Sequence, residues 1–206
     1  LSANQHPNIL PLLHAIKTQY DSILVTPYKP AGTLADQIFY QHHFISNPTD
    51  VKVVFCQITL ALDFCHGQGI AHQDIKPENI LCSPDIQVYL ADFGLATTEY
   101  PSTSFKCGTR AYMGPECLGG LLTPVASYNT FLNNFWSLGV VLMNLLTTRR
   151  LWDEASPADA KFTCFVMHDF RFIGGLPNEH SHYSFILCNM LCPEDCRTSV
   201  FELVKN

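Results

Sequence analysis

Apolar residues recur at helical spacing in two long segments of the chain. From Asp50 to His66 they repeat every three or four positions, with Pro48 before the segment and Gly67 and Gly69 after it. From Phe131 to Leu146 they occupy nearly every face. The first pattern predicts an amphipathic helix with its own start and stop signals. The second predicts a helix buried at the centre of a helical domain.

Shorter runs predict strands and further helices. The apolar runs Leu12–Ile16 and Ser22–Thr26 are separated by polar residues and predict a hairpin. Ile80–Cys82 and Val88–Leu90 lie on either side of a Ser-Pro-Asp turn and predict two brief strands. Further short helices are expected at Thr33–Tyr40, Ala158–Met167, Tyr183–Leu191 and Thr198–Val204. Together these elements indicate an α+β fold, with a small strand-rich edge beside a mainly helical body.

A long loop is predicted between Ala96 and Pro115. The segment is rich in Thr, Ser and Gly and has no periodicity that would favour a helix or a strand. Long loops held on a rigid base usually carry function in compact domains. We therefore expect this loop to border the functional site.

Composition narrows the class of protein. The 206 residues are 47% hydrophobic, enough for one core, and the net charge of −6 comes without a run of Lys or Arg, so we expect no nucleic acid partner. The most apolar stretch, Leu138–Leu146, is far shorter than the ~20 residues of a membrane-spanning helix, so we expect no membrane partner. The chain starts at Leu1 without a signal peptide, and we expect it to begin in mid-domain.

The nine cysteines are odd in number and lack paired metal spacing, which favours reduced thiols and a cytoplasmic or nuclear location. Cys188, Cys192 and Cys196 recur every four residues, a spacing that could form a zinc face. Pro193 interrupts the repeat and no pair of His ligands accompanies it. Buried core thiols are therefore favoured over a zinc site.

The residues with the strongest chemical signal are HQDIKPEN at 72–79 and Asp-Phe-Gly at 92–94. Phosphoryl transfer requires an acceptor for a hydroxyl proton, cations that neutralise the triphosphate, and oxygen ligands for those cations. This pair of segments contains all of these residue types. An Asp-Phe-Gly tripeptide alone would be weak evidence, since Asp and Gly are common in turns.

Further segments in the right order make the pattern specific. They are Gly108-Thr109, Pro115-Glu116, the WSLG run at 136–139, and Pro193 with Arg197. Together with 72–79 and 92–94, they resemble the motifs of eukaryotic serine/threonine protein kinases. The resemblance covers nearly the whole chain. It implies a truncated kinase-like fold over residues 1–206, with a remnant of the β-rich N-lobe at 1–28 and a mainly helical C-lobe at 29–206.

The resemblance also assigns roles to the catalytic residues. Asp74 would orient the substrate hydroxyl and accept its proton, and Lys76 would contact the transferring phosphate. Thr109 would bond both of these residues. Asn79 and Asp92 would bind Mg²⁺. The implied cofactors are ATP and Mg²⁺, and the implied partner is a protein substrate with Ser or Thr.

A second set of residues would surround the adenine. Thr26 is at the gatekeeper position, and the carbonyl of Pro27 and the amide of Lys29 would face the base. Pro27 replaces a more usual glutamate, but proline keeps its carbonyl acceptor. Leu81 would form the floor of the pocket, although an ordinary core leucine explains it equally well.

Longer phrases resemble a group of fungal serine/threonine kinases that regulate meiosis, filamentous growth and nutrient response. These phrases are VYLADFGLATT, PECLGG and WSLGVVLMNLL.

Several positions depart from the kinase pattern. The chain contains no Gly-rich loop, no ATP-anchoring lysine and no partner glutamate, and Lys17 is expected on a strand instead of in the lysine's role. Gln73 replaces an arginine, so the hydroxyls of residues 97–104 are expected to be ordinary loop groups without a cationic partner for phosphate. Asn134 replaces an aspartate that braces the catalytic loop. Gly114 replaces an alanine and is expected to loosen its turn.

Three hypotheses follow. The intact protein is an ATP-dependent serine/threonine kinase, or it is a pseudokinase or truncated binding module, or the chain is an eroded fragment. The missing N-lobe parts favour the binding module for these 206 residues by themselves. The family assignment to kinases is the same for the first two hypotheses.

Overall fold

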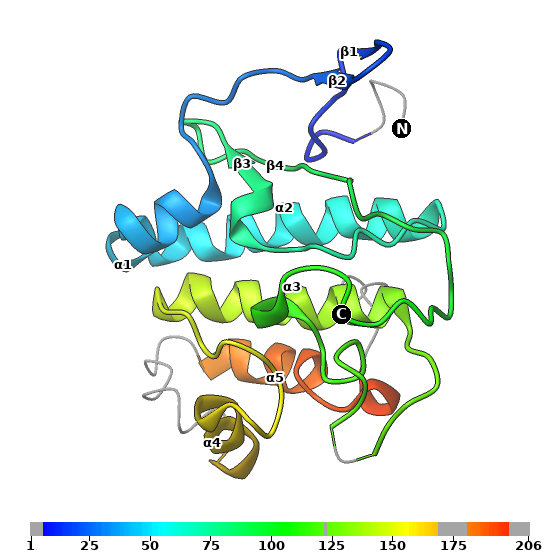
Figure 1. The fold of residues 1–206 in the computed structure, drawn as a ribbon. Helices are drawn as coiled ribbons and strands as arrows, with labels where there is room; N and C mark the ends of the chain where they lie inside the picture. Colours follow the sequence, from blue (N-terminus) through cyan, green and yellow to red (C-terminus); the bar gives the residue numbers. More distant parts are fainter. Residues whose placement is uncertain (1–5, 122, 169–180, 198–206) are drawn as a thin grey trace.

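The computed structural model describes residues 6–121, 123–168 and 181–197. Its elements are stacked in layers (Figure 1), with a short hairpin at one end and a small sheet lying on helix α2. Helix α3 packs beneath α2, and α5 packs beneath α3. The outcome is a mainly helical body with few strands, as the sequence predicts.

The helices of the described part are α1 (His43–Ser46), α2 (Pro48–Gly67), α3 (Thr130–Thr147), α4 (Ala160–His168) and α5 (Ser181–Met190). The sequence predicts all of them except α1, with bounds that differ by one or two residues. Pro48 occupies the first turn of α2, and Gly69 follows the helix at a φ of 71°, so both predicted boundary signals are confirmed. The helix expected at Thr198–Val204 lies outside the described residues.

Both predicted strand pairs are confirmed. Strand β1 (His14–Lys17) pairs antiparallel with β2 (Ser22–Val25), and β3 (Ile80–Cys82) pairs antiparallel with β4 (Val88–Leu90). Each pair forms a two-stranded sheet of its own. Lys17 lies on β1, as expected.

Short turns complete the chain trace. The helical segment predicted at Thr33–Tyr40 is mostly a π-helical turn, η1 (Asp36–Tyr40), held by a bond from the Thr33 amide to the Asp36 carboxylate. The segment η2 (Pro77–Asn79) and the segment η6 (Glu194–Cys196) are single 3₁₀ turns. A further 3₁₀ turn, η3 (Arg110–Tyr112), interrupts the long loop predicted between residues 96 and 115.

The main core lies between α2 and α3. Ile58 and Leu62 of α2 and Leu138 of α3 are fully buried, and nearly every residue of α3 is inaccessible to solvent. The prediction of a helix at the centre of the domain is therefore confirmed. Burial of this many large side chains supplies the main favourable free energy of folding.

A second, smaller core lies beside the first. It consists of Met113, Cys117 and Tyr128, with Phe105 and Leu118 packed against it. We call it the Tyr128 cluster. It joins the long loop at 96–115 to the segment that leads into α3, so these two stretches are held to each other and not only to the main core.

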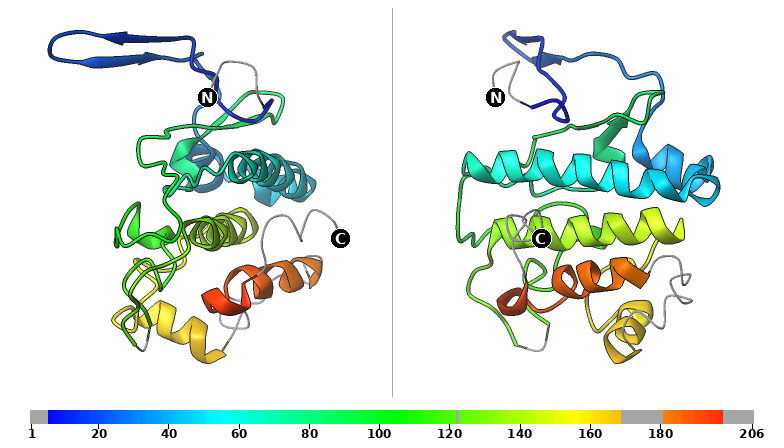
Figure 2. Two further views of the ribbon diagram at one scale, coloured as in Figure 1. Left: turned by 90° about the vertical axis from the view of Figure 1, so that its right-hand side faces the viewer. Right: turned by 180° about the vertical axis from the view of Figure 1, so that it is seen from behind.

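The N-terminal residues divide into two kinds. All four residues of β1 and the first three of β2 are exposed, and the hairpin projects away from the body (Figure 2). The residues before it lie on the body instead, because the Leu10 amide donates to the Leu90 carbonyl at 2.9 Å and the Leu90 amide donates to the Asn8 carbonyl at 2.8 Å. No described helix is both long enough and apolar enough to cross a membrane.

The cysteines of the last segment are not buried core thiols. Cys188 and Cys196 are exposed and Cys192 is half-buried, so this prediction was wrong. The buried positions of α5 are Tyr183, Leu187 and Met190, which recur at helical spacing, and Cys188 follows Leu187 on another face. The described residues also contain no cluster of three or more His, Cys, Asp or Glu side chains that could hold a metal.

Candidate active site

Asp74 is the centre of a group of polar side chains in the loop that follows α2. Its Oδ1 accepts a hydrogen bond of 2.7 Å from the Thr109 hydroxyl. Its Oδ2 lies 2.8 Å from Nζ of Lys76 and accepts a bond of 3.0 Å from Nδ2 of Asn79. Lys76 also donates to the Thr109 hydroxyl oxygen at 2.8 Å. The structure thus brings four of the predicted site residues into direct contact.

The charge state of Asp74 follows from these contacts. Burial alone would raise the pKa of its carboxyl, but hydrogen bonds from Lys76 and Thr109 and the positive charge of Lys76 outweigh burial and hold the pKa below its ordinary value. The carboxylate is therefore ionised at neutral pH. An ionised, fixed carboxylate can accept a hydrogen bond from a substrate hydroxyl and receive its proton.

The backbone of this loop is held in an unusual conformation. Gln73 has a φ of 65°, in the left-handed region that a residue with a long side chain rarely adopts. Its amide donates to the Asn134 side chain at 2.9 Å. The Asn79 side chain donates to the Asp74 carbonyl at 2.9 Å, closing the loop from its other end. These bonds hold Asp74 between two fixed points.

His72 joins this loop to the segment that carries Asp92. Its Nδ1 accepts from the Asp74 amide at 3.2 Å, and its Nε2 donates to the Ala91 carbonyl at 2.8 Å. One neutral imidazole satisfies both bonds, and burial lowers the pKa of His72 and favours that neutral form. The ring of Phe93 packs against His72 at 4.7 Å between centroids.

The segment that carries Asp92 is bonded to Asn79. The Ala91 amide donates to the Asn79 carbonyl at 2.9 Å, so the residue before Asp92 is bonded directly to the residue that carries the other proposed metal ligand. Asp92 itself is exposed and has a φ of 57°. Its Oδ1 accepts one long bond of 3.3 Å, from the Gly94 amide. The carboxylate therefore keeps most of its capacity for a cation.

The side chains of Asn79 and Asp92 fit a magnesium ion. The amide nitrogen of Asn79 faces Asp74, which leaves its oxygen as the ligand atom. Mg²⁺ prefers oxygen ligands and is usually held by one or two protein groups, with phosphates and water completing the octahedron. Two oxygen ligands beside an ionised aspartate match that chemistry.

The residues predicted around the adenine are less tightly organised. Thr26 is exposed just after β2, and Pro27 is half-buried. Lys29 places its Nζ 3.3 Å from the centre of the Tyr89 ring, and Tyr89 is the strand partner of Leu81. Leu81 is half-buried, so it is not an ordinary fully buried core leucine. Within the part of the chain that the structure describes, neither Thr26 nor Pro27 forms a hydrogen bond with the four residues around Asp74.

The long loop reaches the catalytic loop at Gly108. Gly108 has a φ of 113°, and a Cβ on it would collide with the Gln73 carbonyl and lie 3.6 Å from the Asp74 carboxylate. Only glycine combines this backbone conformation with so close an approach. Gly108 thereby brings the adjacent Thr109 within reach of Asp74.

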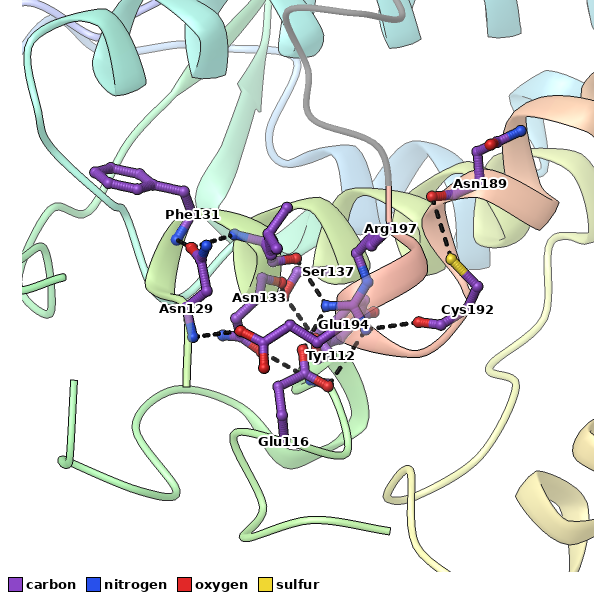
Figure 3. A network of polar contacts seen from close by, with 12 residues as sticks. Tyr112, Glu116, Asn129, Phe131, Asn133, Ser137, Asn189, Cys192, Glu194 and Arg197 are labelled. Atoms are coloured by element: carbon purple, nitrogen blue, oxygen red, sulfur yellow. Dashed lines mark hydrogen bonds and ion pairs between the residues drawn. The ribbon is translucent and has the colours of Figure 1, made fainter. Parts of the chain in front are cut away.

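A buried ion pair anchors the end of this loop (Figure 3). Arg197 donates from both of its terminal nitrogens to the Glu116 carboxylate. The Gly114 amide donates to the Asn133 side chain at 2.8 Å, and a Cβ at Gly114 would collide with the Glu116 carboxylate. Gly114 therefore gives the ion pair its space, which is a role that the expectation of a loosened turn did not include.

Asn134 braces the catalytic loop although it replaces the family's aspartate, and it has a partner that the sequence does not indicate. Its Nδ2 donates to Nε2 of His66 at 3.1 Å, while its oxygen accepts from the Gln73 amide. Burial lowers the pKa of His66 to about 4, so the ring is neutral and can accept this bond. His66 lies near the end of α2, where the sequence pattern gives only a helix terminus.

Comparison with known proteins agrees with the motifs. The family described as protein kinase domain matches residues 1–197. The chain is 37% identical over 193 residues to the negative regulator of sexual conjugation and meiosis of Schizosaccharomyces pombe, covering 84% of this chain and 41% of that protein. It is 32% identical over 217 residues to serine/threonine-protein kinase VHS1 of Saccharomyces cerevisiae, covering 100% of this chain and 47% of that protein.

A third relative, serine/threonine-protein kinase SKS1 of Saccharomyces cerevisiae, is 34% identical over 166 residues, 75% of this chain and 33% of that protein. The chain thus spans less than half the length of these relatives. The fold of a helical lobe with two small sheets, the residues gathered around Asp74 and the match over residues 1–197 agree with one another. The chain belongs to the eukaryotic serine/threonine protein kinase family.

Proposed function

We propose that the whole protein transfers the γ-phosphate of ATP to Ser and Thr hydroxyls of protein substrates. The observation that carries this proposal is the closed set of contacts among Asp74, Lys76, Thr109 and Asn79. A carboxylate, an ammonium group and a hydroxyl held within 3 Å of one another supply a proton acceptor beside a positive charge. Catalysis of phosphoryl transfer consists mainly of such positioning and charge stabilisation.

The roles of the individual residues follow from their contacts. Asp74 accepts the hydrogen bond of the substrate hydroxyl and receives its proton. Lys76 places its charge beside Asp74 and stabilises the negative charge of the transferred group. Thr109 fixes the separation of these two side chains. Mg²⁺, when held by Asn79 and Asp92, neutralises the charge of the triphosphate.

The adenine of ATP is proposed to lie against Thr26, the Pro27 carbonyl, the Lys29 amide and Leu81. Support comes from the chain path, because the Cys82 amide donates to the Gly32 carbonyl at 2.9 Å and Thr33 bridges to Leu81. The segment after Lys29 is thereby fixed to β3. We propose residues 1–28 as the N-lobe remnant and residues 29–206 as the C-lobe, since the exposed hairpin falls within the first range.

The alternative function, a binding module without catalysis, was motivated in part by Gln73 and Asn134. Both replacements keep the contact that matters for the loop, because the Gln73 amide still donates to the Asn134 side chain. Asp74 also keeps its contacts with Lys76, Asn79 and Thr109. The geometry therefore favours the enzyme over the binding module.

The test is phosphate transfer from Mg-ATP by the full-length protein and two variants, Asp74→Ala and Asp92→Ala. Asp74→Ala removes the positioned proton acceptor, which costs about 10²- to 10⁴-fold in rate, and Asp92→Ala removes a proposed ligand of Mg²⁺. We expect each variant to lose at least about 100-fold. Asp85→Ala, in the exposed turn between β3 and β4, is the control and should retain its activity. Equal phosphate transfer by the wild type and both variants would exclude the proposal.

A further inference from the structure

Tyr128 connects the catalytic loop to the long loop at 96–115. Its hydroxyl donates to Oε1 of Gln73 at 2.7 Å and lies 3.1 Å from the Ser104 carbonyl oxygen. The residue is 1% exposed, so water does not compete for these bonds. A buried phenol thus bridges two segments that are otherwise far apart in the sequence.

Gln73 is bonded at both ends of its side chain. Its Nε2 donates to the Leu95 carbonyl at 3.3 Å, while its Oε1 accepts from Tyr128. Gln73 directly precedes Asp74, and Leu95 directly follows the Asp-Phe-Gly segment. The carboxamide therefore ties the two acid-bearing segments to Tyr128, at a position whose backbone already has a φ of 65°.

Tyr128 is itself held firmly. Its amide and carbonyl exchange two hydrogen bonds of 3.0 Å with Ser102, and its ring packs in the Tyr128 cluster with Met113 and Cys117. The ring of Phe105 is 5.8 Å away. The hydroxyl therefore has a fixed position from which to hold Gln73, and is not a mobile group that happens to be near it.

We propose that Tyr128 is a positioning residue: its hydroxyl donates a neutral bond to Gln73, and its backbone is bonded to Ser102, so it holds the catalytic loop against the loop at 96–115. The kinetic part of this inference rests on the proposed phosphoryl transfer, and the structural part does not. No charge takes part in the bridge. Burial also raises the pKa of Tyr128, so the hydroxyl remains a donor at any physiological pH.

The first test measures hydrogen exchange of the full-length protein carrying Tyr128→Phe, which removes the hydroxyl and keeps the ring. Amides of residues 72–79 and 102–106 should exchange at least about fivefold faster than in the wild type, because a buried acceptor loses its partner. Tyr112→Phe is the matched control. Tyr112 is also a buried phenol that donates to a carboxamide, Oδ1 of Asn144 at 3.1 Å, but this bond lies near the C-terminal end of α3, whereas Gln73 is bonded to Asn134 near its N-terminal end.

The control should leave the exchange of 72–79 unchanged. Wild-type exchange in Tyr128→Phe would overturn the proposal, and so would faster exchange spread evenly over α2 and α3, since that would indicate a global loss of stability. This measurement does not need an active enzyme. If the wild type transfers no phosphate, the exchange result still decides the inference while the proposed function fails separately.

The second test is kinetic. In an active protein, Tyr128→Phe should lower kcat about tenfold with KM for Mg-ATP within twofold, because the bridge orients Asp74 and does not touch the adenine side. Gln73→Met should give a similar loss, and the double variant should be no worse than either single one. Additive losses, or an equal loss in Tyr112→Phe, would show that Tyr128 acts only through general stability.

Discussion

The catalytic loop and the β1–β2 hairpin are supported very differently. Residues 72–79 are held from several directions, by α3 through Asn134, by the long loop through Thr109 and by the segment before Asp92 through His72. The hairpin has mainly its own strand pairing, and Leu24 is 67% exposed. The proton acceptor is therefore positioned by the helical body, whereas the residues proposed around the adenine lie beside a segment that the body supports little. Mutations around Asp74 should therefore change kcat, whereas mutations beside the hairpin should change KM for Mg-ATP.

The largest expected difference between the two regions is in stability. Glu116→Gln removes the charge that pairs with buried Arg197, and breaking a buried ion pair from one side costs about 3–5 kcal/mol of unfolding free energy. Leu24→Ser, on the exposed hairpin, should cost no more than about 0.5 kcal/mol. Chemical denaturation of the full-length protein measures both values.

The two variants also test the comparison itself. A loss in Leu24→Ser as large as that in Glu116→Gln would show that the hairpin is as strongly supported as the ion pair. Glu116→Asp, which keeps the charge on a shorter side chain, should retain part of the stability lost in Glu116→Gln. An unfolding free energy between those of the wild type and Glu116→Gln would show how much of the loss comes from the missing charge and how much from the position of the carboxylate.

The same substitution at two threonines, one in each region, compares the regions by their kinetic effects. Thr109→Val removes the hydroxyl between Lys76 and Asp74, and we expect kcat to fall about tenfold because Asp74 loses one of its orienting bonds. Thr26→Val makes the same change beside the hairpin. It should alter KM for Mg-ATP by no more than about threefold and leave kcat nearly constant. Steady-state kinetics at varied ATP concentration separate the two effects.

A different kinetic pattern would contradict the assignment of kcat to the catalytic loop and of KM to the hairpin side. If Thr26→Val lowered kcat as much as Thr109→Val, the two regions would act as one unit. Melting temperatures of both variants provide the control, since both substitutions are nearly isosteric.

Contiguous motifs made much of the site predictable. Asp74, Lys76 and Asn79 lie within six residues of one another, so one recognised segment places all three. The two apolar runs on either side of the Ser-Pro-Asp turn give the bounds of β3 and β4. The pairing of Glu116 with Arg197 could be predicted only from the family resemblance. Neither its burial nor the space that Gly114 leaves for it follows from the sequence pattern.

The residues that the sequence did not indicate act over long separations. Tyr128 reaches Gln73 across 55 positions and His66 reaches Asn134 across 68. Hydrophobic periodicity describes only neighbours within an element, so it cannot show which buried polar groups meet. The error at Cys188 has a different cause: α5 ends at Met190, so the three cysteines of the four-residue repeat do not lie on one helix and do not mark a buried face.

The smallest expected effect concerns the brace between Asn134 and His66. The pKa of His66 is lowered to about 4 in the folded protein, whereas an unfolded histidine titrates near 6.5, so the unfolded chain binds more protons between these values. Stability should therefore fall as the pH drops from about 6.5 and level off below about pH 4. Urea unfolding of the full-length protein at several pH values measures this slope.

His66→Gln should flatten part of that slope, because glutamine offers an acceptor and does not titrate. His72, whose pKa burial also lowers, should account for a further part of the loss in the same pH window. The carboxylates with lowered pKa, Asp36, Asp74 and Asp159, lose their contribution to stability only as the pH falls below their ordinary pKa, so they do not interfere. An identical slope in wild type and His66→Gln would mean that the brace of the catalytic loop does not depend on a neutral histidine.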